Sequence, residues 1–382
     1  MKYDFIISGG GIAGLTTAIA LQNEGYHVKV LERMKELKVV GAGLGLGANA
    51  WKGLAHLGIT NDLEMNCNLI KSTKFLDQKG NLISEMDIDR LNRKYGVAYF
   101  TIHRADLQKV LIQRLLPGTL QYGKKIINFE QNETGVTVYL EDGKSVEGDA
   151  LIAADGIHSA VRKKCLPDIK PRYSGYTCWR AVVKVPNKNY VPGEFTETWG
   201  SKGRFGIVPL TNDQIYWFAC VNAPFQDKDF SAFKTIDLYH LFHDYHSLIP
   251  EILKWTPDEN LIWNDIIDLK PLSRFAFDKM LLIGDAAHAT TPNIGQGASQ
   301  AIEDAIILSN VLKKYKNIQD AFCEFEKQRI PKTKKIINLS WRIGKAAQLE
   351  NRLQIRIRNL VIRILPAKIQ ENQLEAVFHT DF

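Results

Sequence analysis

Cysteine is scarce in this 382-residue sequence, and long apolar runs are absent. The five cysteines form no CxxC pair, and an odd number in a chain of this length argues against a disulfide framework. No apolar segment reaches the roughly 18 residues that a transmembrane helix needs. The first predicted strand begins by Tyr3, which leaves no room for a signal peptide. We therefore expect a reduced protein in the cytoplasm.

Motifs of several other protein classes are also missing. The nine histidines show no HxxxH spacing, which argues against the common zinc sites, so we expect no bound metal. No GxSxG segment indicates a serine hydrolase. The net charge of +7 arises from interspersed acidic and basic residues, and no nucleic-acid-binding motif is present. The positive excess favours the approach of anionic substrates or cofactors.

The first 32 residues predict a βαβ unit. Residues 3–8 and 27–32 are short apolar segments of strand type, and residues 15–26 between them have helical character. The turn after the first strand carries a GxGxxG pattern, formed by Gly9, Gly11 and Gly14. The first glycine permits a tight turn, the second lets backbone N–H groups approach a pyrophosphate, and the third lets the helix pack on the strand.

Glu32 ends this unit and can accept hydrogen bonds from the hydroxyl groups of a ribose. The unit therefore predicts an adenine dinucleotide site, without distinguishing NAD from FAD. A second glycine-rich stretch, residues 40–50, follows no long strand and has a different spacing. Two interpretations stay open for it: a backbone segment pressed against a large flat ligand, or a flexible turn before a helix at residues 51–57.

The pattern changes between residues 173 and 263, where aromatic runs of strand type are separated by turns. This predicts a mostly antiparallel sheet inserted into an α/β domain. The chain returns to the first domain in residues 280–300, where a buried strand runs into Gly284-Asp285 and then a helix. A carboxylate in that position suits a ligand that carries hydroxyl groups. The remainder is predicted to be helical, with breaks near residues 316–317, Pro331 and Pro366.

Three motifs together resemble the single-component flavin-dependent aromatic hydroxylases of the p-hydroxybenzoate hydroxylase type. They are GGGIAG at 9–14 with Glu32-Arg33, Ala154-Asp155-Gly156 with Ser159 and Arg162, and Gly284-Asp285-Ala286-Ala287-His288 with Pro292 and Gly295-Gln296-Gly297. The resemblance covers about residues 3–345. It implies an α/β fold in which a Rossmann-like FAD-binding domain of the glutathione-reductase type carries an inserted, mostly antiparallel substrate domain. The implied boundaries are 1–70, 101–172 and 272–340 for FAD, 71–100 and 173–271 for substrate, and 341–382 for a C-terminal helical segment.

The resemblance also implies FAD as the cofactor and NAD(P)H as the co-substrate. The pyrophosphate would lie on the glycine turn, the adenosine ribose on Glu32, and the ribityl chain on Asp285. Backbone N–H groups at 295–298 would approach the pyrimidine edge of the flavin, where negative charge develops on reduction. The implied cofactor-binding residues are Gly9, Gly11, Gly14, Glu32, Arg33, Gly45, Arg104, Ile126, Asp155, Asp285, Gly295, Gln296, Gly297 and Ala298.

Residues 175–180, 203–206 and 216–219 resemble the branch that holds salicylate, 3-hydroxybenzoate and bacterial urate hydroxylases and plant zeaxanthin epoxidase. The branch implies that Arg204 lies beside the flavin; the alternative is a salt-bridged strand residue. Tyr216 is either an active-site aromatic or a core residue. The candidate catalytic residues are Arg204, Tyr216, Arg180 and Asn293. Cys178 and Asn293 depart from the asparagine and aspartate of the urate type, which weakens a urate assignment.

The implied reaction is hydroxylation of a small electron-rich aromatic or heteroaromatic substrate by O2 and NAD(P)H, through a flavin C4a-hydroperoxide. His288 is then a structural residue near the cofactor loop. We expect a monomer or homodimer that binds no nucleic acid. Two alternatives are an epoxidase or hydroxylase of a larger isoprenoid or polyketide at a membrane, and a flavin-binding regulator without turnover.

The C-terminal segment combines an apolar stripe with positive charge between residues 342 and 368. A basic amphipathic helix of this kind can lie on an anionic membrane. Relatives of this type often end in an arginine-rich helix that packs on the body of the protein. We favour packing or a dimer contact over the membrane.

Overall fold

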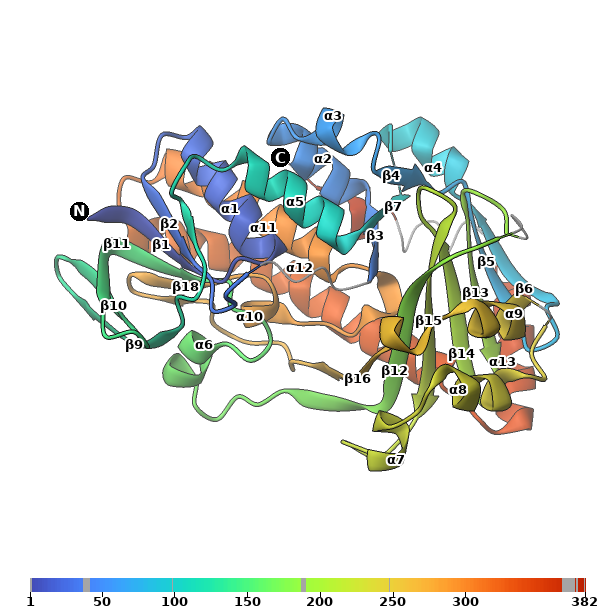
Figure 1. The fold of residues 1–382 in the computed structure, drawn as a ribbon. Helices are drawn as coiled ribbons and strands as arrows, with labels where there is room; N and C mark the ends of the chain where they lie inside the picture. The colour runs from blue at the N-terminus through green and yellow to red at the C-terminus, as the bar shows by residue number, and fades with distance from the viewer. Residues whose placement is uncertain are drawn as a thin grey trace.

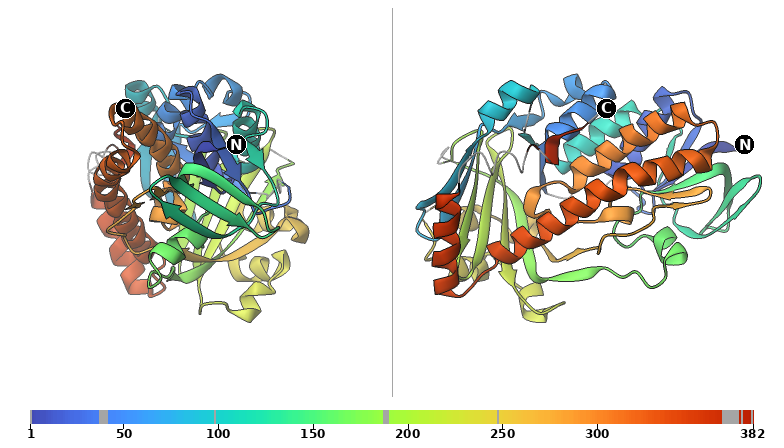
Figure 2. Two further views of the ribbon diagram at one scale, coloured as in Figure 1. Left: turned by 90° about the vertical axis from the view of Figure 1, so that its left-hand side faces the viewer. Right: turned by 180° about the vertical axis from the view of Figure 1, so that it is seen from behind.

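The computed structural model describes residues 2–36, 42–97, 99–186, 190–246, 248–365, 375, 377–380 and 382. It shows two regions side by side, one built on an eight-stranded sheet and the other on a seven-stranded sheet (Figure 1). Long helices near the C-terminal end run along the first region and reach the second (Figure 2). Within the described residues, no helix is long and apolar enough to cross a bilayer.

The eight-stranded sheet has the path β17-β18-β11-β1-β2-β8, and β10 joins β9 to β11. β1 pairs in parallel with β2 and β11, and β11 pairs in parallel with β18. The carboxyl ends of these strands therefore share one edge, where ligands of open α/β sheets bind. The strands are β1 (Tyr3–Ser8), β2 (Val28–Leu31), β8 (Leu120–Gln121), β9 (Ile126–Asn132), β10 (Gly135–Leu140), β11 (Ser145–Ala153), β17 (Ala276–Phe277) and β18 (Met280–Leu282).

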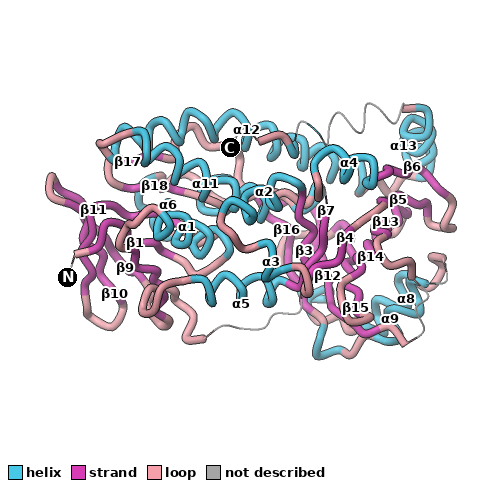
Figure 3. Tube along the Cα trace, turned by 90° about the horizontal axis from the view of Figure 1, so that it is seen from above, coloured by secondary structure: helices cyan, strands magenta, loops and turns pink. Residues whose placement is uncertain are grey.

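Four helices pack together as a layer against this sheet (Figure 3). They are α1 (Ile12–Asn23), α5 (Arg104–Arg114), α11 (Gly297–Lys314) and α12 (Ile318–Ala347). Apolar residues of β1, β2, β11 and β18 form one core with residues of α1, α11 and α12. The βαβ unit predicted from the first 32 residues is present, with α1 between β1 and β2.

The break predicted near Pro331 is wrong, because α12, which is 30 residues long, continues through that residue. A proline in a helix removes one backbone hydrogen bond. Buried Arg329 and Thr333 flank it, and the Thr333 hydroxyl donates to the Arg329 carbonyl at 2.9 Å. Tertiary contacts on both sides therefore hold the helix. The helix instead ends at Ala347, before α13 (Arg352–Ile364), and the break predicted near Pro366 lies outside the described residues.

The glycine-rich stretch forms β3 (Gly43–Gly47), which pairs with β7 (Tyr99–His103) in a small sheet completed by β4 (Cys67–Leu69). The flexible turn considered for this stretch is therefore wrong for residues 43–47, since cross-strand pairing orders the backbone. Residues 40 and 41 lie outside the described part. Helix α2 (Ala48–His56) follows directly.

The seven-stranded sheet has the order β16-β12-β15-β14-β13-β5-β6. Its pairs are antiparallel except for β13 with β5, so the prediction of a mostly antiparallel sheet is confirmed. Helices α8 (Thr235–Phe242) and α9 (Leu248–Trp255) share a core with one of its faces. The strands are β5 (Ser72–Asp77), β6 (Leu82–Asp87), β12 (Arg172–Lys184), β13 (Glu194–Gly200), β14 (Gly203–Pro209), β15 (Gln214–Asn222) and β16 (Ile262–Asp268).

The remaining elements are short and connect these layers. They are α3 (Thr60–Leu63), α4 (Ile88–Tyr95), α6 (Ala160–Cys165), α7 (Lys228–Ser231), α10 (Asp285–His288) and the 3-10 turns η1 (Asp258–Asn260) and η2 (Pro292–Ile294). Two of them, α10 and η2, lie between β18 and α11, where the chain passes from the first sheet toward the second.

Candidate active site

The glycine turn after β1 has the geometry of a dinucleotide-binding turn. Gly9 has φ +105°, and a Cβ there would lie 2.4 Å from the Ala154 carbonyl oxygen. A Cβ on Gly14 would lie 1.9 Å from the Gly9 carbonyl oxygen, so the helix packs against the strand as predicted. A Cβ on Gly11 would meet nothing within 4 Å. The backbone at Gly11 is therefore open to an approaching phosphate group.

Glu32 follows β2 at the same edge of the sheet. Its Oε2 accepts a hydrogen bond from the Gly10 N–H at 2.7 Å, and its Oε1 accepts one from the Met34 N–H at 2.8 Å. An ionised carboxylate has about four acceptor positions, so two hydrogen bonds leave capacity for ribose hydroxyls. The neighbouring Arg33 is exposed. Ribose binding by Glu32 and Arg33 stays a prediction.

Asp285 follows β18 and begins α10. Its side chain is exposed to solvent, yet surrounding protein raises its pKa by desolvation, against the opposing effects of His288, Arg104 and Arg162. The Asp285 carboxylate is therefore open to solvent and yet surrounded by protein. A Cβ on Gly297 would lie 4.0 Å from this carboxylate, so the start of α11 lies beside it.

Arg162 interacts electrostatically with both Asp155 and Asp285. Oδ2 of Asp155 accepts from the Ala160 N–H at 2.8 Å, whereas its buried Oδ1 has no partner among the described residues. Burial raises the pKa of Asp155. Arg162 is buried and donates through Nη1 to the Ala286 carbonyl at 2.9 Å, which ties α6 to α10. An unsatisfied acceptor at the end of β11 fits a polar ligand.

Arg104 begins α5. Its pKa is lowered by desolvation, with Asp285 raising it and Arg180 lowering it further. Arg104 therefore lies within electrostatic reach of both Asp285 and the seven-stranded sheet. Its role beside the flavin stays a prediction.

Strand β3 forms a wall whose glycines permit close approach of side chains. A Cβ on Gly43 would lie 2.6 Å from Cβ of Tyr216, and one on Gly45 would lie 2.0 Å from the Tyr99 hydroxyl. Gly295 has φ +61°, and a Cβ there would lie 3.4 Å from the same hydroxyl. Part of the need for glycine in this stretch therefore comes from two tyrosines of the protein itself.

The α11 end of the site is fixed by buried amides. Gln296 accepts through Oε1 from Asn49 Nδ2 at 3.1 Å and from Gln300 Nε2 at 3.0 Å. Its own Nε2 is buried without a partner among the described residues. Gly297 and Ala298 are half-buried at the first turn of the helix. Their position suits N–H donation to a ligand, which stays a prediction.

His288 is buried, and its Nε2 lies 2.7 Å from Asp304 Oδ2. The same oxygen accepts from the Gly284 N–H at 2.8 Å. Burial would raise the pKa of Asp304, but His288 and Arg329 hold it at about 2. This network anchors the turn that carries Asp285, and it agrees with a structural role for His288.

The inner face of the seven-stranded sheet lies toward the cofactor region. Arg180 donates through Nη2 to Asn264 Oδ1 at 2.5 Å and interacts with the Tyr216 hydroxyl. Burial alone would lower the pKa of Arg180, but Cys178 and Tyr216 raise it overall. Cys178 lies opposite Cys220 in the pairing of β12 with β15. A cation, a phenol and two thiols thus share one surface.

Arg204 lies beside this surface and is only 2% exposed. Nη1 donates to Glu197 Oε1 at 3.0 Å, and Nη2 donates to Asn293 Oδ1. The Tyr176 hydroxyl donates to the same Asn293 oxygen at 3.0 Å. The salt bridge considered as the alternative for Arg204 is therefore present. Contact of Arg204 with a ligand stays a prediction.

Asn293 connects three parts of the molecule. Besides accepting from Arg204 and Tyr176, it donates through Nδ2 to the Thr291 hydroxyl and to the Ser340 carbonyl, both at 2.8 Å. The substrate sheet, the loop before α11 and the helix α12 thus meet at one side chain. Its position supports a positioning role.

The structure adds residues that sequence reasoning missed. Glu197 and Tyr176 complete the Arg204 network, and Asn49 supports Gln296. Along the sequence, Glu197 and Trp199 alternate with Thr196 and Thr198. This is a weak signal that Glu197 and Trp199 share one face of a strand. Ile126, in contrast, is packed in the core of the eight-stranded sheet, and its backbone contact with cofactor stays untested.

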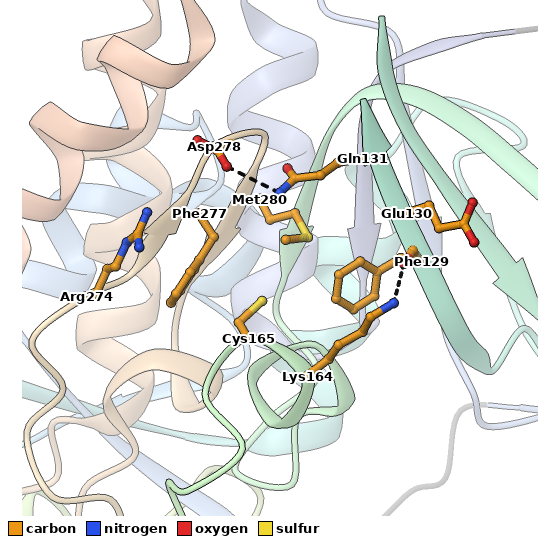
Figure 4. A pocket seen from close by; sticks show the side chains of 9 residues that line it. All are labelled: Phe129, Glu130, Gln131, Lys164, Cys165, Arg274, Phe277, Asp278 and Met280. Atoms are coloured by element: carbon orange, nitrogen blue, oxygen red, sulfur yellow. Dashed lines mark hydrogen bonds between the residues drawn. The ribbon is translucent and has the colours of Figure 1, made fainter. Parts of the chain in front are cut away.

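A cavity of about 400 Å³ lies elsewhere, beside β9 and β17 (Figure 4). Lys164 and Arg274 line it, but both already donate to carbonyl oxygens at 2.6 Å, of Phe129 and Ala276 respectively. The groups of the glycine turn, Asp285 and Arg204 are absent from its lining. This cavity is therefore not the site that the sequence predicts.

Known proteins match over most of the chain. A family model described as an FAD binding domain matches residues 2–321. The Aurachin C monooxygenase/isomerase of Stigmatella aurantiaca is 36% identical, with 94% of each chain covered. The FAD-dependent urate hydroxylase of Klebsiella pneumoniae is 32% identical, with 87% of each chain covered. Among solved structures, K. pneumoniae HpxO complexed with FAD and uric acid has a TM-score of 0.91 at 27% identity, covering 98% of this chain and 96% of that one.

These matches confirm the predicted fold class, the family resemblance and FAD as the cofactor. The residues at the strand ends fit that cofactor. The open backbone at Gly11 suits its phosphates, and the exposed carboxylate of Asp285 and the unsatisfied oxygen of Asp155 are acceptors for hydroxyl groups. The chain belongs to the FAD binding domain family, and it is an FAD-dependent monooxygenase.

Proposed function

We propose that the enzyme hydroxylates a small, electron-rich nitrogen heteroaromatic compound, using NAD(P)H and O2. The observation that carries this proposal is the placement of Arg180 and Tyr216 on the sheet face that lies opposite β3 and near Arg104. A planar ring between that face and the cofactor would meet hydrogen-bond donors along one edge. The similarity to a urate hydroxylase supports a heteroaromatic ring.

Each residue of the inner face has a separate task in this proposal. Arg180 donates to a ring carbonyl or an ionised oxygen of the substrate. Burial raises the pKa of Tyr216, so its phenol stays protonated at neutral pH and acts as a donor. Phe218, Cys178 and Cys220 provide an apolar surface that excludes water from the ring. FAD, when bound, supplies the activation of O2 for oxygen transfer.

Cofactor placement falls to the residues at the strand ends. Gly9, Gly11 and Gly14 receive the pyrophosphate, Asp285 receives hydroxyl groups of the ribityl chain, and the first turn of α11 contacts the ring edge. Arg104 lies between the two binding regions and helps compensate negative charge. Asn293 and Arg204 fix the position of the substrate sheet relative to the loop before α11 and to α12, because hydrogen bonds join all three.

A substrate screen tests the proposal. Oxidation of NADH and NADPH is measured with purines, hydroxypyridines, quinolones and hydroxybenzoates, and products are analysed by mass spectrometry for one added oxygen atom. We expect stimulation and an oxygenated product from a nitrogen heterocycle. Stimulation by hydroxybenzoates alone would contradict the substrate class while leaving the monooxygenase intact.

The variant Arg180→Met tests the proposed binding edge. Loss of a charge-assisted hydrogen bond costs about 1.5–3 kcal/mol, so kcat/KM falls about tenfold to a hundredfold. The matched control is Arg274→Met, which lies beside the remote cavity and leaves kcat/KM unchanged. FAD content is measured for both. Equal kcat/KM for Arg180→Met and the wild type would show that the substrate lies elsewhere.

A further inference from the structure

Helix α13 packs on the protein through a side of mixed polarity and turns a stripe of large apolar residues outward. The residues that face the body are Ile355, Arg358, Asn359 and Ile362. The exposed residues are Leu353, Ile357, Leu360, Val361 and Ile364, each between 52% and 69% exposed. A surface helix of a globular protein normally has the reverse arrangement.

The side of α13 that faces the body is held by apolar packing of Ile362 and by specific polar contacts. Arg358 is buried, and its Nη1 donates to the carbonyl oxygens of Ala346 and Ala347 at 3.0 and 3.3 Å. Its guanidinium lies 4.9 Å from the ring centre of Trp199. Burial lowers the pKa of Arg358 to about 10, which still leaves it charged at neutral pH. These contacts fix the rotation of the helix, so the apolar side faces outward.

The exposed apolar side chains form one continuous stripe. They recur at i, i+4, i+7, i+8 and i+11, which places them on a single face. Other large exposed apolar residues, such as Met65, Leu116 and Ile127, belong to separate elements. Scattered apolar residues are ordinary on a protein surface, whereas a continuous stripe indicates a binding surface.

Positive charge runs along one side of this stripe. Arg352, Arg356 and Arg363 are exposed and recur at i, i+4 and i+11, so they form a row beside the apolar residues. Arg363 also donates through Nε to the Leu82 carbonyl at 3.2 Å and lies 4.0 Å from Asp77, so Arg352 and Arg356 carry most of the available charge. The sequence from 351 to 365 contains no aspartate or glutamate. The partner of this surface should therefore combine an apolar interior with negative charge at its boundary.

We propose that α13 docks in the plane of an anionic lipid bilayer. Its apolar stripe would enter the boundary between headgroups and acyl chains, and the arginine row would meet lipid phosphates. The helix has 13 residues, about 20 Å of length, which suits a helix lying on the bilayer. A second copy of the same helix offers no acidic side chain to the arginines, so self-association fits less well.

The docked helix adjoins the substrate side of the molecule. Trp199, which lies under Arg358, donates through Nε1 to Glu197 Oε1 at 2.9 Å, and Glu197 binds Arg204. Figure 2 shows α13 beside the seven-stranded sheet, away from the eight-stranded sheet. Docking would thus place the lipid surface next to the substrate region and leave the far end of the cofactor region in water.

Vesicle flotation of the full-length, FAD-loaded protein tests the proposal. Phosphatidylcholine vesicles are compared with vesicles that also contain phosphatidylglycerol. We expect flotation with the anionic vesicles, weak flotation with phosphatidylcholine alone, and loss of flotation at high salt. Absence of flotation with anionic vesicles at low salt would overturn the proposal.

Three variants distinguish lipid binding by α13 from nonspecific hydrophobic adsorption. Ile357→Ser/Leu360→Ser/Ile364→Ser is expected to lower the vesicle partition coefficient more than tenfold, because each side chain loses apolar burial. The matched control Met65→Ser/Leu116→Ser/Ile127→Ser removes as many exposed apolar side chains elsewhere and should bind as the wild type does. Arg352→Gln/Arg356→Gln should lower the coefficient about fivefold per arginine.

Unchanged FAD content and thermal unfolding show that each variant is folded. If the apolar variant fails this check, the arginine variant decides, because it removes charge and leaves the apolar residues of the helix unchanged. Wild-type binding by the apolar variant or by the arginine variant would overturn the proposal. So would dimerisation in light scattering that the apolar variant abolishes, since the stripe would then be covered by a second copy.

Discussion

The two faces of the seven-stranded sheet are built from the same strands, yet only the inner face carries buried charges. On the outer face, Trp179, Phe205 and Trp217 pack under α8 and α9 in an apolar core. On the inner face, Arg180 and Arg204 stand among hydroxyl, amide and thiol groups that lie toward the cofactor region. Side chains alternate along a strand, so neighbouring residues belong to different environments.

Because of this difference, the residues that stabilise the sheet alternate along each strand with the residues of the proposed active site. Burial of large apolar side chains on the outer face stabilises the sheet by the hydrophobic effect. A buried ion pair such as Arg204 with Glu197 contributes little net stability, because desolvation opposes the attraction. The outer face therefore holds the sheet together, and the inner face can retain buried charges.

The largest expected effect comes from replacing Trp217 by alanine. Trp217 is fully buried, stacks on Phe205 with ring centres 5.2 Å apart, and donates through Nε1 to the Thr256 hydroxyl at 2.9 Å. Its loss should lower the free energy of unfolding by about 3–5 kcal/mol. Urea unfolding followed by fluorescence and circular dichroism measures this change.

The neighbouring variant Tyr216→Phe is the matched control on the inner face. It removes one hydroxyl and keeps the ring, so the free energy of unfolding should change by less than about 1.5 kcal/mol. Substrate-stimulated NAD(P)H oxidation should nevertheless decrease. If Tyr216→Phe destabilised the protein as much as Trp217→Ala, the division between the two faces would be wrong.

The next effect concerns the ion pair on the inner face. Glu197→Gln leaves the Arg204 cation buried without its counter-charge, which should lower the free energy of unfolding by about 3 kcal/mol. The double variant Glu197→Gln/Arg204→Met removes both charges and should recover most of that loss. Urea unfolding of both variants tests this non-additivity.

Activity should not recover with stability in that pair. The double variant lacks the Arg204 contacts to Asn293 and Tyr176, which join the sheet to the loop before α11. Its NAD(P)H oxidation should therefore yield more peroxide and less hydroxylated product than the wild type gives. If the double variant still coupled all NAD(P)H oxidation to hydroxylation, Arg204 would only balance the charge of Glu197.

The cofactor side could be predicted from the sequence because its determinants are local. Gly9, Gly14 and Glu32 occur within one βαβ unit, so their spacing alone defines the turn and the strand that follows. The turn at Gly284-Asp285 is equally compact. The role of the glycines in β3 was harder to predict, because their contacts with Tyr99 and Tyr216 join chain segments that lie far apart in sequence.

The substrate side could be predicted only in part, since its contacts are long-range. Arg204 binds Asn293, which is 89 residues later, and Asn293 binds Ser340, which is a further 47 residues away. Hydrophobic alternation predicts which residues share a face, but it does not align one strand with a distant loop. Pro331 shows the same limit, because tertiary packing outweighs its local preference.

The smallest expected effect is a pH dependence at the outer face, through His246. Its Nε2 lies 2.8 Å from the Thr198 hydroxyl, and burial lowers its pKa against the opposing effect of Asp77. The unfolded chain therefore takes up the proton first as the pH falls below about 6.5, and the free energy of unfolding decreases through that window. His246→Gln should flatten this slope by at most the equivalent of one proton, measured by urea unfolding from neutral pH downward. Above that window, the free energies of unfolding of wild type and variant should show the same pH dependence. If His246→Gln left the slope below the window unchanged, another group would titrate there, and the stability provided by the outer face would not depend on the charge of His246.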